Sequence, residues 1–102
     1  MNIQMIKANN ILSGQHWFEP ETLRFFKSRI LSTVYGGKYF ITRETNPSGE
    51  MRFSIREAID GGKRINTVGA FHSIKTLAEA KDAARAMAES DRGVTAINQA
   101  VA

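Results

Sequence analysis

Three runs of alternating apolar and polar residues lie in the middle of the chain, at 38–43, 51–59 and 63–71. Alternation with a period of two residues is typical of β-strands that bury one face. Turn-forming residues separate the runs, namely NPSG at 46–49 and DGG at 60–62, and such clusters between alternating runs indicate hairpins. The pattern therefore predicts an antiparallel sheet of three strands.

The segment before this sheet predicts a first helix, near residues 19–31. Pro20 suits the first helical position, because its missing amide hydrogen would have no partner there in any case. The apolar residues that follow it recur at helical spacing. Residues 1–15 contain apolar side chains without a clean period, and we expect them to form an N-terminal arm.

The segment after the sheet predicts a second helix, near residues 76–89. Thr76 and Glu79 have the spacing of a capping box, which pairs two backbone donors at the start of a helix. A narrow apolar stripe rich in alanine follows and would let the helix lie close to the sheet. Gly93 is expected to end the helix, which leaves 91–102 as a C-terminal tail.

The order of these elements predicts an α+β fold of the type α-β-β-β-α. Its three-stranded antiparallel sheet would carry both helices on one face, and its other face would be wet. The chain of 102 residues is long enough for a single domain with a modest core. We expect residues 16–90 to form the folded core of that domain.

The composition excludes several classes of protein. The absence of cysteine excludes disulfides, thiolate nucleophiles and cysteine-based zinc sites. No apolar run approaches the roughly 20 residues that a membrane span needs, and the N-terminus lacks the pattern of a signal peptide. We therefore expect a cytoplasmic protein with no membrane partner.

The charge favours a polyanionic partner, because the formal net charge is +4. The excess is not uniform along the chain. Residues 1–37 and 38–71 each carry a net charge of +2, whereas residues 72–102 hold four charges of each sign. The cationic excess therefore lies in the predicted first helix and the sheet.

Candidates for catalysis are few. The chain has two histidines, His16 and His72, and neither has a carboxylate nearby in a catalytic pattern. We interpret His72 as a loop residue at the end of the third strand. No cluster of residues has metal-ligand spacing, and the glycine pairs match no phosphate-binding loop. The sequence predicts a non-enzymatic protein that uses no cofactor and no metal.

A binding surface is the stronger candidate. Arg52 and Arg56 would share the outward face of the central strand, and Lys63 and Arg64 would join them across the second hairpin. Such a face can approach phosphates or enter a major groove, where arginine reads guanine edges. The alternative is a solvated face without a partner.

The second candidate surface is aromatic and consists of Trp17, Phe18 and Phe25. These side chains offer more aromatic surface than one short helix normally buries. One interpretation is core packing against the sheet. The other is an exposed patch that anchors a protein partner.

Residues 51–88 resemble the small arm-type or AP2-like DNA-binding domains of phage integrases, with a T-x-x-E-A helix start at Thr76, Glu79 and Ala80. The resemblance implies DNA binding and would place Arg52, Arg56, Lys63 and Arg64 on the DNA-facing strands. The α-β-β-β-α order also resembles a double-stranded-RNA-binding domain. The lysine pair of that family at the helix start is absent here, where only Lys75 and Lys81 lie nearby.

Residues 23–88 resemble a small uncharacterised domain of phages, prophages and plasmids, through RFFKSRI, GGKYFITRE, MRFSIRE and NTVGAFHSIKTLAEAKDAA. This resemblance implies an accessory protein of a mobile element that docks on a host protein or nucleoprotein complex, including CRISPR effectors. The leading hypothesis is therefore a non-enzymatic inhibitor or modulator of the anti-CRISPR type. The alternative is a DNA-binding module of the integrase-arm or AP2-like kind, with DNA or RNA as its partner.

Overall fold

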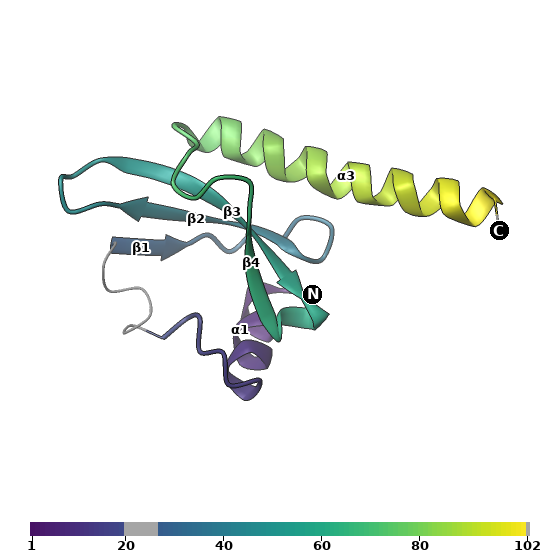
Figure 1. Cartoon of the computed structure of the whole chain (residues 1–102), viewed down its shortest axis with the longest axis horizontal. Helices are drawn as coiled ribbons and strands as arrows, with labels where there is room; N and C mark the ends of the chain where they lie inside the picture. The colour runs from purple at the N-terminus through teal and green to yellow at the C-terminus, as the bar shows by residue number, and fades with distance from the viewer. Residues whose placement is uncertain (20–26, 102) are drawn as a thin grey trace.

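The computed structural model describes residues 1–19 and 27–101. These residues form an α+β structure with an antiparallel sheet, which confirms the predicted class. The elements are α1 (Ile3–Leu12), β1 (Lys27–Ile30), β2 (Tyr39–Thr45), β3 (Met51–Ile59), the 3₁₀ turn η1 (Asp60–Gly62), β4 (Arg64–Val68) and α3 (Leu77–Val101). Figure 1 shows α3 lying along one side of the sheet and α1 on the other side, close to η1.

The sheet of the described residues has the strand order β1-β2-β3-β4, and each strand pairs antiparallel with the next in sequence. The predicted hairpin at 46–49 joins β2 to β3. The side chain of Asn46 accepts hydrogen bonds from the Glu50 amide at 2.9 Å and from the Ser48 hydroxyl at 2.8 Å. Gly49 has φ +88°, a conformation that glycine adopts without strain. Local turn chemistry thus sets the register of the two central strands.

The face of the sheet under α3 is apolar, as the alternation in the central strand predicts. Ile41 and Phe53 pack there against Ala80 and Ala84, and all four residues are at most 5% exposed. The small alanine side chains allow the helix to approach the sheet closely. The predicted start of the helix is also confirmed, because the Thr76 hydroxyl accepts a hydrogen bond from the Glu79 amide at 3.2 Å.

The opposite face of the sheet is also covered. Ile3 and Ile6 of α1 pack against a group of side chains that alternate with those under α3, namely Phe40, Ala58 and Ile65. The chain passes very close to the helix at Gly62, where a Cβ would lie 2.5 Å from the Ile6 carbonyl oxygen. The prediction of an N-terminal arm is therefore wrong for residues 3–12, which form a helix of the core.

Two other predictions of helix bounds are corrected. The helix predicted over 19–31 is wrong at Lys27–Ile30, where the chain pairs with β2 as an edge strand. Residues 20–26 lie outside the described residues. The helix predicted to stop at Gly93 continues to Val101, and Figure 1 shows that α3 extends past the sheet.

Candidate functional site

Arg56, which we predicted on a solvent-exposed sheet face, is buried. It is 6% exposed, and its Nη2 atom lies 2.9 Å from an oxygen of Glu44, which is 1% exposed. The alternation was predicted correctly, because Phe53 and Ile55 lie under α3 and Arg56 faces the other way. The prediction that this other face is wet is wrong, because α1 and the segment after it cover that face.

The buried arginine belongs to a closed hydrogen-bond network. Its Nε donates to the Thr42 hydroxyl at 3.0 Å, and its Nη1 donates to the Thr67 hydroxyl. The Glu44 carboxylate accepts further hydrogen bonds from Thr42 and, at 3.0 Å, from Ser54. No buried side-chain nitrogen or oxygen of the described residues lacks a partner, which is what a buried charge requires.

Two aromatic rings lie close to the guanidinium of this network. The Arg56 Cζ atom lies 4.8 Å from the ring centre of Trp17 and 5.1 Å from that of Phe71, within the range of a cation–π interaction. Burial lowers the pKa of Arg56, and the Glu44 carboxylate opposes that shift. The arginine stays charged, and its role in this position is to hold the sheet face together.

Arg52 lies on the same face as Arg56 but nearer the hairpin. Its side chain is 28% exposed and lies 3.3 Å from the carboxylate of Glu50. It also donates to the Met51 carbonyl oxygen at 2.8 Å. Partly exposed ion pairs of this kind contribute up to about 1 kcal/mol. Arg52 is accessible to solvent, and its charge is already balanced.

The other two predicted sheet cations do not join the arginines of β3. Lys63 and Arg64 are exposed. In the register of the second hairpin Arg64 pairs with Ile59, whereas Thr67 lies opposite Arg56. By the pleat, Arg64 therefore points to the opposite face from Arg56. The predicted four-residue basic surface is not assembled.

The predicted aromatic surface packs in part on the core. Trp17 and Phe18 are half-buried, and their ring centres lie 5.0 Å apart in an edge-to-face arrangement. Both rings also contact Phe40, at 6.3 Å and 6.0 Å. Of the two interpretations, core packing therefore describes Trp17 and Phe18. Phe25 lies outside the described residues.

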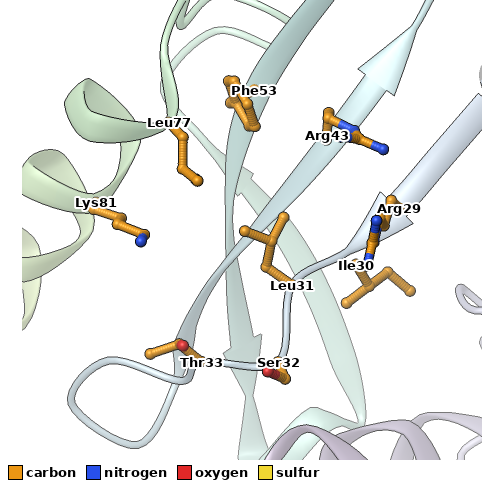
Figure 2. Close-up of a pocket in the computed structure, with 9 residues that line it drawn as sticks. All are labelled: Arg29, Ile30, Leu31, Ser32, Thr33, Arg43, Phe53, Leu77 and Lys81. Carbon is orange, nitrogen blue, oxygen red and sulfur yellow. The ribbon is translucent and has the colours of Figure 1, made fainter.

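A pocket of about 440 Å³ lies on the α3 side of the sheet, between β1 and the start of α3. Its cationic side chains are Arg29, Arg43 and Lys81, and Ser32 and Thr33 also line it. Figure 2 shows the two arginines together on neighbouring strands, with Lys81 on the other side of the pocket. We call this feature the cationic pocket.

The floor of the cationic pocket is apolar. Leu31 lies between the arginines and Lys81 in Figure 2, and Phe53 and Leu77 lie above it in that view. Leu31 and Leu77 are partly buried against the core cluster under α3. A concave site with an apolar floor and a few convergent polar groups is the usual form of a small-molecule site.

Within the described residues, acids do not balance the charges of the cationic pocket. None of the described residues that line it is acidic, and within residues 1–19 and 27–91 no ion pair involves Arg29, Arg43 or Lys81. Arg29 and Arg43 are direct cross-strand partners in the β1–β2 register. Like charges in that position repel each other, so an anion bound between them would be stabilising.

Sequence reasoning missed this pocket for one main reason. Arg43 pairs with Phe53 over the α3 face. Arg29 lies within residues 19–31, which were predicted as a helix, so the strand that brings the two arginines together was absent from the prediction. The available signal was the period of two in Lys27–Ile30, where the charged residues Lys27 and Arg29 alternate with the uncharged residues Ser28 and Ile30.

A polar cluster anchors α3, and therefore the Lys81 wall of the pocket, to the end of the sheet. The Asp91 carboxylate accepts a hydrogen bond from the Tyr39 hydroxyl at 2.5 Å and lies 2.9 Å from the Lys38 amine. The hydrogen bond from Tyr39, followed by that from Lys38, lowers the pKa of Asp91. The same carboxylate and Glu57 raise the pKa of Lys38 well above its usual range.

His72 is held against the two central strands by hydrogen bonds. The ring nitrogen Nε2 of His72 lies 3.0 Å from the Glu44 carbonyl oxygen, and its backbone amide donates to Ser54 at 2.7 Å. No group of three or more candidate ligands is close enough to hold a metal ion among the described residues. None of the helices in those residues is long and apolar enough to span a membrane.

Comparison with known proteins identifies a family. The sequence model of Family of unknown function (DUF7447) matches residues 2–85, and the chain belongs to that family. The matched range contains α1, the whole sheet and the start of α3, together with every residue that lines the cationic pocket. No curated protein and no solved structure matches the chain.

Proposed function

We propose that the protein is a non-enzymatic accessory protein of a mobile element, which docks on a host nucleoprotein complex and inhibits or modulates it in the manner of an anti-CRISPR protein. Its docking surface is the cationic pocket. The observation that carries the proposal is the group Arg29, Arg43 and Lys81, which has no acidic partner among the described residues.

The electrostatics support a phosphate-bearing target. Guanidinium groups match phosphate oxygens with two parallel hydrogen bonds, and such charge-assisted bonds are about twice as strong as neutral ones. The net charge of +4 attracts polyanions over a longer range. The phosphate backbone of the nucleic acid in a nucleoprotein complex offers both the local and the long-range attraction.

The sequence supports the biological setting. Residues 23–88 resemble the accessory domains of phages, prophages and plasmids described above. Proteins of that kind act by docking on host machinery, without a cofactor.

The alternative function, a DNA-binding module of the integrase-arm or AP2-like kind, has weaker support. That function would use Arg52, Arg56, Lys63 and Arg64 on one face of the sheet. Arg56 is buried with Glu44, and Arg64 points to the other face. A buried arginine cannot reach a base edge without breaking its ion pair.

A plasmid-interference assay tests the docking proposal. Host strains that each carry one type of CRISPR system would express the protein, and transformation by a targeted plasmid would be counted. We expect at least one system to be inhibited by the wild-type chain. The double reversal Arg29→Glu/Arg43→Glu should abolish inhibition, because it turns an attraction for phosphate into a repulsion.

The matched control is Lys7→Glu/Arg85→Glu, which makes the same change in net charge at exposed or half-buried positions outside the pocket. It should keep inhibition. The variant Lys63→Glu/Arg64→Glu distinguishes the alternative function from docking through the pocket, because only the alternative function requires those two residues. Failure of the wild-type chain to inhibit any system in the panel would reject the anti-CRISPR proposal.

A further inference from the structure

We infer that the cationic pocket binds one nucleotide of a single-stranded nucleic acid, with the phosphate between Arg29 and Arg43 and the base on the apolar floor. This inference rests on the proposed function, because it names the part of the nucleoprotein that the docking surface contacts. The ligand is a nucleoside phosphate. It is supplied either by a nucleic-acid strand or by a free nucleotide, and the experiment below distinguishes the two.

The position of the phosphate follows from the arginine pair. Arg29 and Arg43 are direct cross-strand partners, and Figure 2 shows their side chains on the same side of the pocket. Side chains in such a pair have Cβ atoms roughly 4.5–5.5 Å apart. Two arginine side chains that start from neighbouring Cβ atoms are long enough to bring both guanidinium groups to the oxygens of one phosphate, and the bound phosphate would offset their mutual repulsion.

The apolar floor indicates that the ligand is larger than a phosphate. Leu31, Phe53 and Leu77 lie between the arginine pair and Lys81. A volume of about 440 Å³ falls in the range of sites that bury a drug-sized molecule, about 300–1,000 Å³. An inorganic anion would leave this floor wet, whereas a base would cover it.

The shape of the site favours a single strand over a duplex. A duplex presents its phosphates on a convex surface and keeps its bases stacked inside. A base can reach the floor behind the arginines only if it is unstacked. Single strands are bound in this way, by a cationic groove for the backbone and an apolar surface for the base.

Fluorescence anisotropy with a labelled ten-nucleotide DNA strand tests the inference. The competitors are the same sequence as a duplex, a mononucleotide and inorganic phosphate. We expect the strand to bind at least about tenfold more tightly than the duplex, because unstacked bases are available only in the strand. The mononucleotide should compete better than phosphate, since its base covers the floor.

Two variants separate the phosphate contact from the base contact. Arg29→Gln/Arg43→Gln should weaken binding at least about tenfold and flatten the dependence of log K on log salt by about one, because phosphate contacts set that slope. Leu77→Asn should weaken binding about fivefold through the lost apolar contact, with the salt slope unchanged. Lys7→Gln/Arg85→Gln is the charge-matched control and should retain affinity. Circular dichroism would verify the fold of each variant.

The outcomes are decisive and separate from those of the interference assay. The inference would be overturned if the duplex bound as tightly as the strand or more tightly. It would also be overturned if phosphate competed as well as the mononucleotide, or if no probe bound. A mononucleotide that binds as tightly as the strand would support the site and identify free nucleotides as its source. If interference is inhibited while no nucleic acid binds, the docking proposal survives and this inference fails.

Discussion

Two arginine sites lie on opposite faces of the same sheet, and they differ in what surrounds the charge. Arg56 is closed in by Glu44, two threonines and two aromatic rings. Arg29 and Arg43 face each other across a strand pair beside an apolar pocket, without an acidic partner among the described residues. Each guanidinium nitrogen of the first site has a hydrogen-bond partner inside the fold, and the second site is the one that we propose as a binding site.

The difference shows why residue type alone does not identify a binding surface. A charge that is neutralised and hydrogen-bonded inside the fold contributes to stability and to the uniqueness of the packing. A charge next to a like charge costs stability, and this cost is expected at positions kept for binding. The two sites should therefore respond in opposite directions when an arginine is removed.

The largest expected effect is at the closed site. Arg56→Ala leaves the Glu44 carboxylate buried without its partner, and breaking a buried ion pair in this way costs about 3–5 kcal/mol. Since about 1 kcal/mol shifts the midpoint of a domain of this size by roughly 4–8 °C, we expect a loss of more than about 10 °C in thermal denaturation.

Arg52→Ala provides a comparison with Arg56→Ala, because both arginines lie in β3. Arg52 lies on the same face, with 28% of its side chain exposed, and its removal should lower the free energy of unfolding by at most about 1 kcal/mol, because its ion pair is partly exposed. Equal effects of the two substitutions in urea denaturation would show that the Arg56 network does not stabilise the fold.

A smaller effect of opposite sign is expected at the open site. Arg43→Gln removes one member of the cross-strand pair with Arg29 and should stabilise the protein by about 0.2–1 kcal/mol at low salt. The gain should shrink in 0.5 M NaCl, because salt screens exposed charges. Thermal denaturation at both salt concentrations measures it. A clear destabilisation would assign Arg43 a structural role and remove the contrast with Arg56.

An effect of similar size concerns the anchor of α3. The folded protein holds the pKa of Asp91 below its ordinary value, so this carboxylate stabilises the fold at pH values above about 4, and the contribution is lost as the pH falls through the lowered pKa. The side chain is 43% exposed, which limits the contribution to less than about 1 kcal/mol.

Asp91→Asn tests this anchor. It should lower the free energy of unfolding at pH 7 and make almost no difference at pH 2, in urea denaturation at each pH. If the wild-type chain and the variant differ by the same free energy of unfolding at both pH values, the ionised carboxylate does not hold the Lys81 wall of the pocket.

The sequence was most informative where local chemistry decides the structure. The strand Met51–Ile59 has the predicted bounds, and the capping residues Thr76 and Glu79 start α3 as expected. The alternation of Phe53 and Ile55 with Arg56 also identified the face under α3. Each of these features depends on residues close together in the chain.

The remaining features depend on contacts between distant segments. Arg56 was expected to be exposed to solvent because both predicted helices were placed on one face of the sheet. That arrangement left no element to cover the other face. The other face of the sheet has apolar side chains that indicate a second core layer, namely Phe40, Ala58 and Ile65. The residues that cover this layer lie in α1, far away in the sequence. The pairing of Arg29 with Arg43 required a strand at Lys27–Ile30 that the helical spacing around it concealed.

The contact between η1 and α1 has a practical consequence for trimming the chain. Residues 1–15 were predicted from the sequence to be an N-terminal arm, and such a segment is often removed when a minimal fragment is prepared. Asn10 donates a hydrogen bond to the Gly62 carbonyl oxygen at 3.0 Å, and Ile6 touches the same glycine. A fragment that began after residue 15 would expose Phe40, which is 0% exposed in the full chain, and would be prone to aggregate through that bared ring.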